Sequence, residues 1–153
     1  MNRWTKITIG DVASYQAGAL VKALETKAKY SDEQENPVEV AISRITARIR
    51  SDVKSGGFSV DKDCEKIPAE LSPEAIALIV EFSKQRIMQR LSDDERNLAN
   101  AARERLDKIA TGKIKPSLPD NPEAAAESVQ SSGGCVLVRP AMGVPKKSDF
   151  NGL

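Results

Sequence analysis

The character of the chain changes at Gly112, and this change limits what the 153-residue sequence can fold into. Before Gly112, apolar residues recur at helical spacing and several segments carry the start and stop signals of helices. After it, the last 41 residues hold five of the eight prolines and four of the nine glycines, which disfavour regular helix. The sequence therefore predicts a helical body, residues 1–112, and an extended C-terminal arm for partner contact, residues 113–153.

The body is predicted to be all-α, a small bundle of four to five helices. The first helix is expected over residues 9–30, with Gly18 as a point that could split it. The second is expected over residues 37–55, with Gly56 and Gly57 as its stop. The third helix is expected to open with Ser72 as its cap, Pro73 and the first-turn acid Glu74, and the fourth is expected between Ser92 and Gly112. Residues 58–71 are expected to form a loop of fourteen residues.

Single residues predict where these helices begin and which faces are buried. Asn36 and Ser92 are the expected N-caps of the second and fourth helices, and Ser92 pairs with Glu95 in a capping box. The unbroken apolar run 75–80 marks the third helix as the central one. The inner faces predicted from spacing contain Val12, Tyr15, Ala19, Leu20, Ala23 and Leu24 in the first helix, and Leu98, Ala101, Ala102, Leu106 and Ile109 in the fourth.

The composition argues against an enzyme. Histidine is absent, which removes the side chain most used for proton transfer near neutral pH and the commonest transition-metal ligand. Cys64 and Cys135 stand 71 positions apart, which is not metal-ligand spacing, and both are expected to be free thiols. We therefore predict no catalytic residue, no metal site and no cofactor.

Charge and hydropathy restrict the partners. The 23 basic residues nearly balance the 22 acidic ones, so a net charge of +1 gives no long-range field to attract DNA or an anionic membrane. The sequence contains no run of 18 apolar residues, and the N-terminus lacks the apolar region of a secretory signal. We expect a protein made in the cytoplasm that makes no membrane contact.

Two charged clusters have competing interpretations. Arg44, Arg48 and Arg50 could bind nucleic-acid phosphates, but acidic neighbours and an aromatic content of 4% favour a solvated helix face. Asp93 and Asp94 could be read as a carboxylate site, but capping of the fourth helix already accounts for them.

The arm contains one apolar run that a plain linker would not need. Val136, Leu137 and Val138 lie between Gly133-Gly134 and Arg139-Pro140, which predicts one short β-strand. A lone strand in a helical chain has no sheet to join. It could fold back on its own helices, or it could add to a sheet edge on another molecule, and we favour the second. The predicted partner-binding residues are Cys135, Val136, Leu137, Val138 and Arg139.

Three stretches carry a resemblance to a known family: Ala41–Ile45, Ile67–Leu71 and Leu106–Lys113. The layout over residues 8–115 resembles the small helical head-to-tail connector proteins of tailed bacteriophages, the adaptor, neck or head-completion proteins of Mu-like and siphophage type. The chain departs from that pattern in the loop after the second helix, which lacks an aromatic and arginine-rich stretch. It also lacks an Arg-Tyr pair near the start of the last helix, and its arm is long.

The resemblance implies a non-enzymatic structural protein at the virion neck. Members form a ring, usually a dodecamer, beneath the portal protein and link it to a stopper or tail-completion protein, while genomic DNA passes without sequence specificity. The C-terminal segment of such proteins often clasps the portal, and Asp93 and Asp94 would face the DNA channel. The alternative of a different class is a small helical nucleic-acid-binding regulator that uses Arg44, Arg48 and Arg50.

Overall fold

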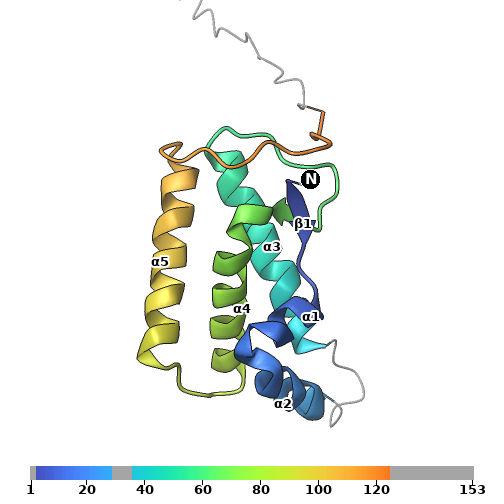
Figure 1. Cartoon of the computed structure of the whole chain (residues 1–153), viewed down its shortest axis with the longest axis vertical. Helices are drawn as coiled ribbons and strands as arrows, with labels where there is room; N and C mark the ends of the chain where they lie inside the picture. The colour runs from blue at the N-terminus through green and yellow to red at the C-terminus, as the bar shows by residue number, and fades with distance from the viewer. Residues whose placement is uncertain (1–2, 29–35, 125–153) are drawn as a thin grey trace, which may run out of the picture.

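The architecture comes from a computed structural model that describes residues 3–28 and 36–124 (Figure 1). In chain order the elements are β1 (Trp4–Lys6), α1 (Ile9–Val12), η1 (Ala13–Ala17), α2 (Gly18–Ala28), α3 (Pro37–Ser55), β2 (Lys66–Pro68), η2 (Ala69–Leu71), α4 (Ser72–Arg86) and α5 (Asp93–Ala110). Within the described residues the fold is mostly helical, as predicted, with five α-helices. It also contains a two-stranded sheet that the sequence did not predict.

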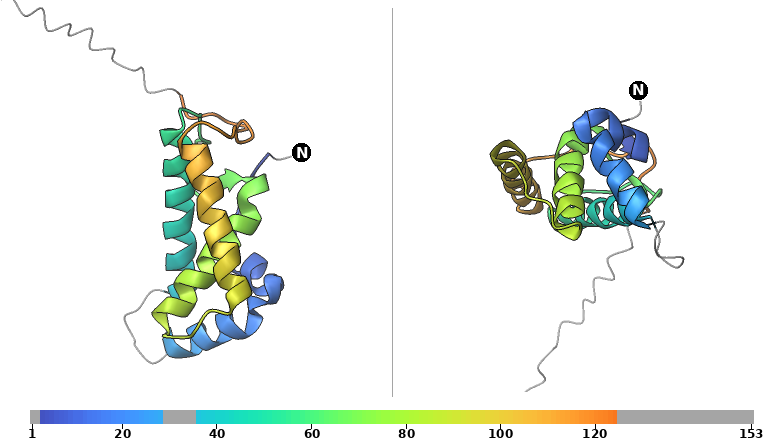
Figure 2. Two further views of the ribbon diagram at one scale, coloured as in Figure 1. Left: turned by 90° about the vertical axis from the view of Figure 1, so that its left-hand side faces the viewer. Right: turned by 90° about the horizontal axis from the view of Figure 1, so that it is seen from below.

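Helix α4 is the centre of the body, as its apolar run predicts. It packs against α3 and α5, and also against the N-terminal helices α1 and α2. Seen from below, α5 lies on one side of α4, and α1 and α2 lie on the other (Figure 2). Ala75, Ile76, Leu78 and Ile79 are buried in the core that α4 shares with its neighbours. Burial of one such aliphatic side chain contributes about 1.5–3 kcal/mol, so α4 supplies much of the core.

The N-terminal helical segment does not split at Gly18; it changes there from a π-helical turn to an α-helix. Thr8 caps α1: its hydroxyl accepts a hydrogen bond from the backbone N–H of Asp11 (3.3 Å), and the Asp11 carboxylate accepts one from the N–H of Thr8 (2.8 Å). The next five residues form the π-helical turn η1, and α2 begins at Gly18. A π-helical turn widens the helix and changes the direction of its side chains, which becomes important for Tyr15 below.

The starts of the other helices confirm two predicted caps and correct one. The side chain of Asn36 accepts a hydrogen bond from Val38 N–H (3.0 Å), and both bonds of the capping box between Ser92 and Glu95 are present. The expected cap at Ser72 is wrong. Because η2 leads directly into α4, Ser72 is itself the first residue of α4, and its backbone N–H donates to the carbonyl of Ala69.

Three helices end in the same backbone motif, in which the last turn closes on a residue with positive φ. In α3, Gly57 N–H donates to the Lys54 carbonyl (2.9 Å) and Phe58 N–H donates to the Val53 carbonyl (3.2 Å). The positive-φ residues after α3, α4 and α5 are Gly57 (82°), Met88 (57°) and Gly112 (74°). The predicted stops at Gly57 and Gly112 are confirmed. Met88 occupies a conformation that favours glycine.

The expected loop 58–71 is only partly irregular. Its end forms β2 and η2, and β2 pairs antiparallel with β1 through Trp4↔Pro68, Thr5↔Ile67 and Lys6↔Lys66. The assumption that this chain offers no sheet is therefore wrong. Strands of three residues are too short to show a period-two pattern, and pairing between segments some sixty positions apart depends on the tertiary fold.

Candidate functional site

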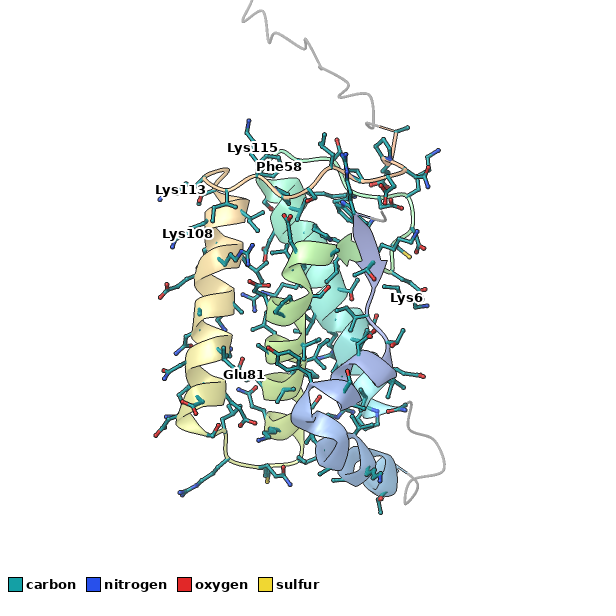
Figure 3. The ribbon with its side chains drawn as sticks, viewed as in Figure 1. Lys6, Phe58, Glu81, Lys108, Lys113 and Lys115 are labelled. Carbon is teal, nitrogen blue, oxygen red and sulfur yellow. The ribbon has the colours of Figure 1, made fainter. Side chains whose placement is uncertain are left out.

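The structure describes only some of the residues predicted to form sites. Cys135, Val136, Leu137, Val138 and Arg139 lie outside the described residues. Asp93 and Asp94 lie at the exposed N-terminus of α5, where they complement the helix dipole, and the Asp93 side chain is 96% exposed. At the other end of α5, Lys108, Lys113 and Lys115 project outward, which suits the negative end of that dipole (Figure 3).

The three arginines of α3 do not form one surface. Arg44 lies with its guanidinium 5.5 Å from the ring centre of Phe82, and Arg48 is exposed and lies 3.9 Å from Asp52. Arg50 is buried. Neither the nucleic-acid interpretation nor the solvated-face interpretation fits Arg50.

Arg50 instead organises the segment that follows α3. Its guanidinium donates hydrogen bonds to the backbone carbonyls of Asp61 (2.6 Å), Asp63 (2.8 Å) and Lys66 (2.9 Å). The same group lies 5.8 Å from the ring centre of Trp4 in β1. One side chain of α3 thereby fixes the path of residues 58–66 and places them beside the sheet.

Asp61 fixes the beginning of the arm. It is buried, and its carboxylate accepts hydrogen bonds from the backbone N–H groups of Asp63 (3.0 Å) and Asn121 (3.2 Å). Burial alone would raise the pKa of Asp61. Those two hydrogen bonds, with the charges of Lys66 and Arg50, outweigh burial and hold the pKa below its ordinary value.

The first part of the predicted arm, residues 113–124, lies on the helical body. Trp4 Nε1 donates to the carbonyl of Ser117 (2.9 Å), and the Glu70 carboxylate accepts from the Ser117 N–H (3.0 Å) and hydroxyl (2.6 Å). Glu123 N–H donates to the carbonyl of Val60 (2.8 Å). The chain beyond this segment therefore begins at a fixed place on the body.

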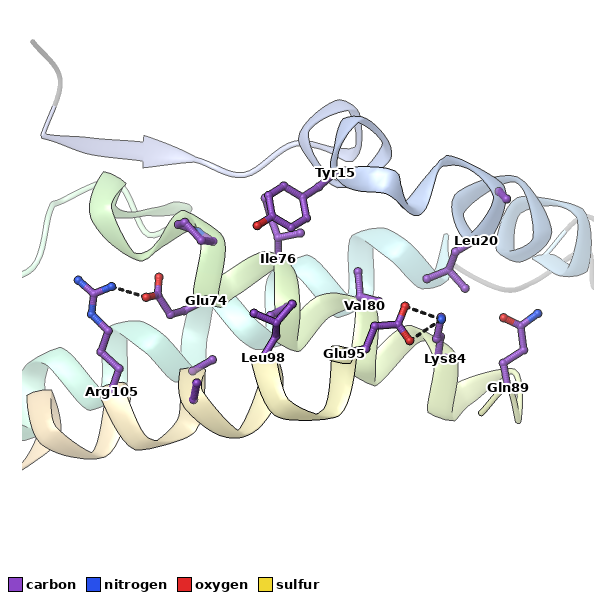
Figure 4. A pocket seen from close by; sticks show the side chains of 15 residues that line it. Tyr15, Leu20, Glu74, Ile76, Val80, Lys84, Gln89, Glu95, Leu98 and Arg105 are labelled. Atoms are coloured by element: carbon purple, nitrogen blue, oxygen red, sulfur yellow. Dashed lines mark hydrogen bonds and ion pairs between the residues drawn. The ribbon is translucent and has the colours of Figure 1, made fainter. Parts of the chain in front are cut away.

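An apolar groove of about 550 Å³ runs along α4, between η1–α2 on one side and α5 on the other (Figure 4). Its apolar lining contains Tyr15, Ala19, Leu20, Pro73, Ile76, Ala77, Val80, Leu98, Ala101 and Ala102. The side chains of Tyr15 and Leu98 are each 53% exposed. The volume lies within the range of roughly 300–1,000 Å³ that is typical of ligand pockets.

Ion pairs between α4 and α5 close both ends of this groove. Glu74 pairs with Arg105 at one end, and Lys84 Nζ bonds to both carboxylate oxygens of Glu95 (2.6 and 2.7 Å) at the other. The hydrogen bond from Lys84 and the capping bonds from Ser92 hold the pKa of Glu95 below its ordinary value, despite partial burial. The groove is therefore an apolar floor with a charged pair at each end.

Sequence reasoning missed the groove but contained a signal for it. Tyr15, Ala19, Leu98 and Ala101 all fall on predicted inner faces, and all four are exposed along the groove. Ala102, Leu106 and Ile109 are buried as predicted. The helical spacing located the apolar faces correctly, but α2 and α5 lie too far apart across α4 to bury each other's apolar residues.

The described residues present neither a metal centre nor a membrane span. Residues 3–28 and 36–124 contain no cluster of three or more His, Cys, Asp or Glu side chains that could hold a metal ion. Cys64 is an exposed free thiol, as predicted. No helix in this part of the chain combines the length and apolar character needed to cross a bilayer.

Fold and surface together define a small, mostly helical protein with an apolar groove along α4. Comparison of the chain with protein-family models, with curated proteins and with solved structures finds no match.

Proposed function

We propose that this protein is a structural head-to-tail adaptor of a tailed bacteriophage. In this proposal the helical body packs side by side with other copies into a ring, usually of twelve, beneath the portal protein at the virion neck. The C-terminal arm reaches the portal, a stopper or a tail-completion protein, and genomic DNA passes through the ring. Asp93 and Asp94, exposed at the start of α5, line the channel, where like charge repels the DNA backbone.

The observation that carries the proposal is the anchored exit of the arm. Asp61 and Val60 bind residues 121 and 123, so the residues after Ala124 start from a fixed point on a rigid helical body. A protein that bridges two assemblies needs this combination of a body that packs and an arm with a defined origin. The resemblance over residues 8–115 supports the same function.

The test is light scattering after size exclusion, on the protein alone and mixed with the portal protein encoded in the same genome. The truncated control ends after Ala124, because ending at Gly112 would also remove Ser117 and Asn121 and their bonds to the body. The full chain should form a portal complex with about one copy per portal subunit, and the truncated chain should not. If neither chain binds the portal, the adaptor function is wrong.

The proposed function also predicts that the apolar run of the arm anchors the protein to the portal. Substitution of Val136, Leu137 and Val138 by alanine should weaken the portal complex and leave the helical circular dichroism of the free protein unchanged. Burial of three such side chains contributes about 4–8 kcal/mol before ordering costs, so a substantial loss of affinity is expected. Full assembly by the triple variant would show that this segment is not the anchor.

The alternative function is a nucleic-acid-binding regulator that uses Arg44, Arg48 and Arg50. Of these three arginines, only Arg44 and Arg48 are exposed. A gel-shift titration at two salt concentrations tests it, because phosphate contacts give a steep salt dependence. Absence of binding at low salt would remove this alternative.

A further inference from the structure

The groove along α4 has the features of a docking site. Tyr15 and Leu98 occupy positions that helical spacing assigns to buried faces, yet each is 53% exposed. The π-helical turn η1 directs Tyr15 over one wall, and α5 brings Leu98 to the other (Figure 4). An exposed apolar strip bounded by charged pairs is typical of a surface that something covers.

The length of the strip matches one segment of this chain. Glu74 and Lys84 mark the two ends of the groove on α4, and ten residues of helix span roughly 15 Å. The apolar run Cys135–Val138 contains four residues, which span roughly 13 Å when extended. It is followed at once by Arg139, so a cation would reach one end of the groove.

The two ends of the groove differ in whether a carboxylate oxygen is left without a hydrogen bond. Both oxygens of Glu95 accept hydrogen bonds from Lys84. At Glu74, Arg105 binds Oε1, whereas Oε2 is buried and accepts no hydrogen bond from the described residues. Because this oxygen is buried, a guanidinium beside Glu74 would supply the missing donor once the Glu74 side chain turns toward the groove. This sets the direction of the segment: Arg139 at the Glu74 end and Cys135 at the Lys84–Glu95 end.

We propose that the groove between η1–α2, α4 and α5 is the docking site for residues Cys135–Arg139 of the same chain. The segment lies there in the free protein and is released when a partner protein binds it. Only this release rests on the proposed adaptor function. The docking itself rests on the groove and on the sequence of the arm.

The reach of the arm allows docking within one chain. Glu123 is held at Val60, and eleven residues, 124–134, separate it from Cys135. Eleven extended residues span up to about 36–40 Å, whereas the whole of α5, with 18 residues, is about 27 Å long. A linker of this length gives an effective concentration of about a millimolar, so a micromolar solution favours a chain's own arm over that of another copy.

The test uses the native Cys135 in the full-length chain. In a Cys64→Ser background, Gln89→Cys places a second thiol at an exposed position that lines the groove beside the Lys84–Glu95 end. A disulfide requires the two Cα atoms to approach within about 7 Å. After mild oxidation at micromolar protein, we expect most chains to be monomers with an internal disulfide, identified by mass and by non-reducing electrophoresis.

Two controls separate docking from chance collision. Ala47→Cys, on an exposed position of α3, should trap Cys135 at least tenfold less. Leu137→Asp, added to the Gln89→Cys chain, should reduce trapping to the level of the Ala47→Cys control, because a carboxylate would have to enter the apolar groove. Equal trapping at both positions, trapping unaffected by Leu137→Asp, no trapping, or disulfide-linked dimers in place of monomers would each overturn the proposal.

The same samples keep this proposal separate from the adaptor function. The internal disulfide should block formation of the portal complex, and reduction should restore it. If the portal complex forms normally but no internal disulfide can be trapped, the docking proposal is wrong and the adaptor function stands. If the disulfide forms and the reduced protein binds no portal, docking stands and the adaptor function is wrong.

Discussion

Replacement of Arg50 should destabilise this protein strongly. Arg50 is only 8% exposed, and its guanidinium donates hydrogen bonds to three backbone carbonyls. A hydrogen bond from a charged donor is worth about 1.5–3 kcal/mol, and water entering the space left by alanine recovers part of the loss. We expect Arg50→Ala to lower the free energy of unfolding by about 3–4 kcal/mol. Arg50→Lys should cost about half as much, because one ammonium cannot replace the planar fork.

The assay is urea unfolding followed by circular dichroism and by the fluorescence of Trp4, the single tryptophan of the chain. Trp4 lies beside Arg50, so its emission should shift before the helices unfold in the variant. Arg48→Ala is the matched control from the same helix. Its single 3.9 Å ion pair is on the surface, and its loss should cost under about 0.5 kcal/mol. A loss below about 1 kcal/mol in Arg50→Ala, with unchanged Trp4 emission, would refute the assigned role of Arg50.

Three further predictions can be checked with the same unfolding assay. Gly56→Ala should lower the free energy of unfolding by more than about 2 kcal/mol, because the added Cβ would overlap the carbonyl oxygen of Ile109, where the ends of α3 and α5 meet. An unchanged midpoint of urea unfolding would contradict that packing. Met88→Gly should stabilise the protein by about 0.5–1 kcal/mol, because glycine adopts the φ of 57° without strain and the Met88 side chain, 95% exposed, loses little packing. A loss of stability would show that the Met88 side chain makes a stabilising contact. Asp61→Asn should cost about 1–2 kcal/mol at pH 7. Because the pKa of Asp61 lies below its ordinary value of 3.8, its contribution is present above that pH and is lost as the pH falls through the folded value. Wild type should therefore lose more stability than Asp61→Asn between pH 5 and about pH 2, and parallel pH profiles would contradict this.

The groove could be predicted only in part. Helical spacing placed Tyr15 of the first helix, and Leu98 and Ala101 of the last, on predicted inner faces. Spacing cannot reveal whether a neighbour covers an apolar face. That depends on the distance between α2 and α5, which α4 sets by lying between them (Figure 2).

Arg50 shows the same limit for charged residues. In the sequence it resembles Arg44 and Arg48, and no local pattern distinguishes the three. Its partners are the carbonyls of Asp61, Asp63 and Lys66, which come within reach only after the chain turns at Gly57 and returns along α3. A buried arginine needs several acceptors at once, and only a folded segment can present them together.

The sequence by itself determined the features that depend on residues within a few positions of each other. These are the caps at Asn36 and Ser92, the stops at Gly57 and Gly112, and the mostly helical class, because a helix bonds each residue to one only four positions away. The tertiary structure alone decided the pairing of β1 with β2, the burial of Arg50 and the exposure of Leu98. Each of these depends on contacts between segments far apart in the chain, whose approach is set by the packing of the helices around α4 rather than by any local pattern.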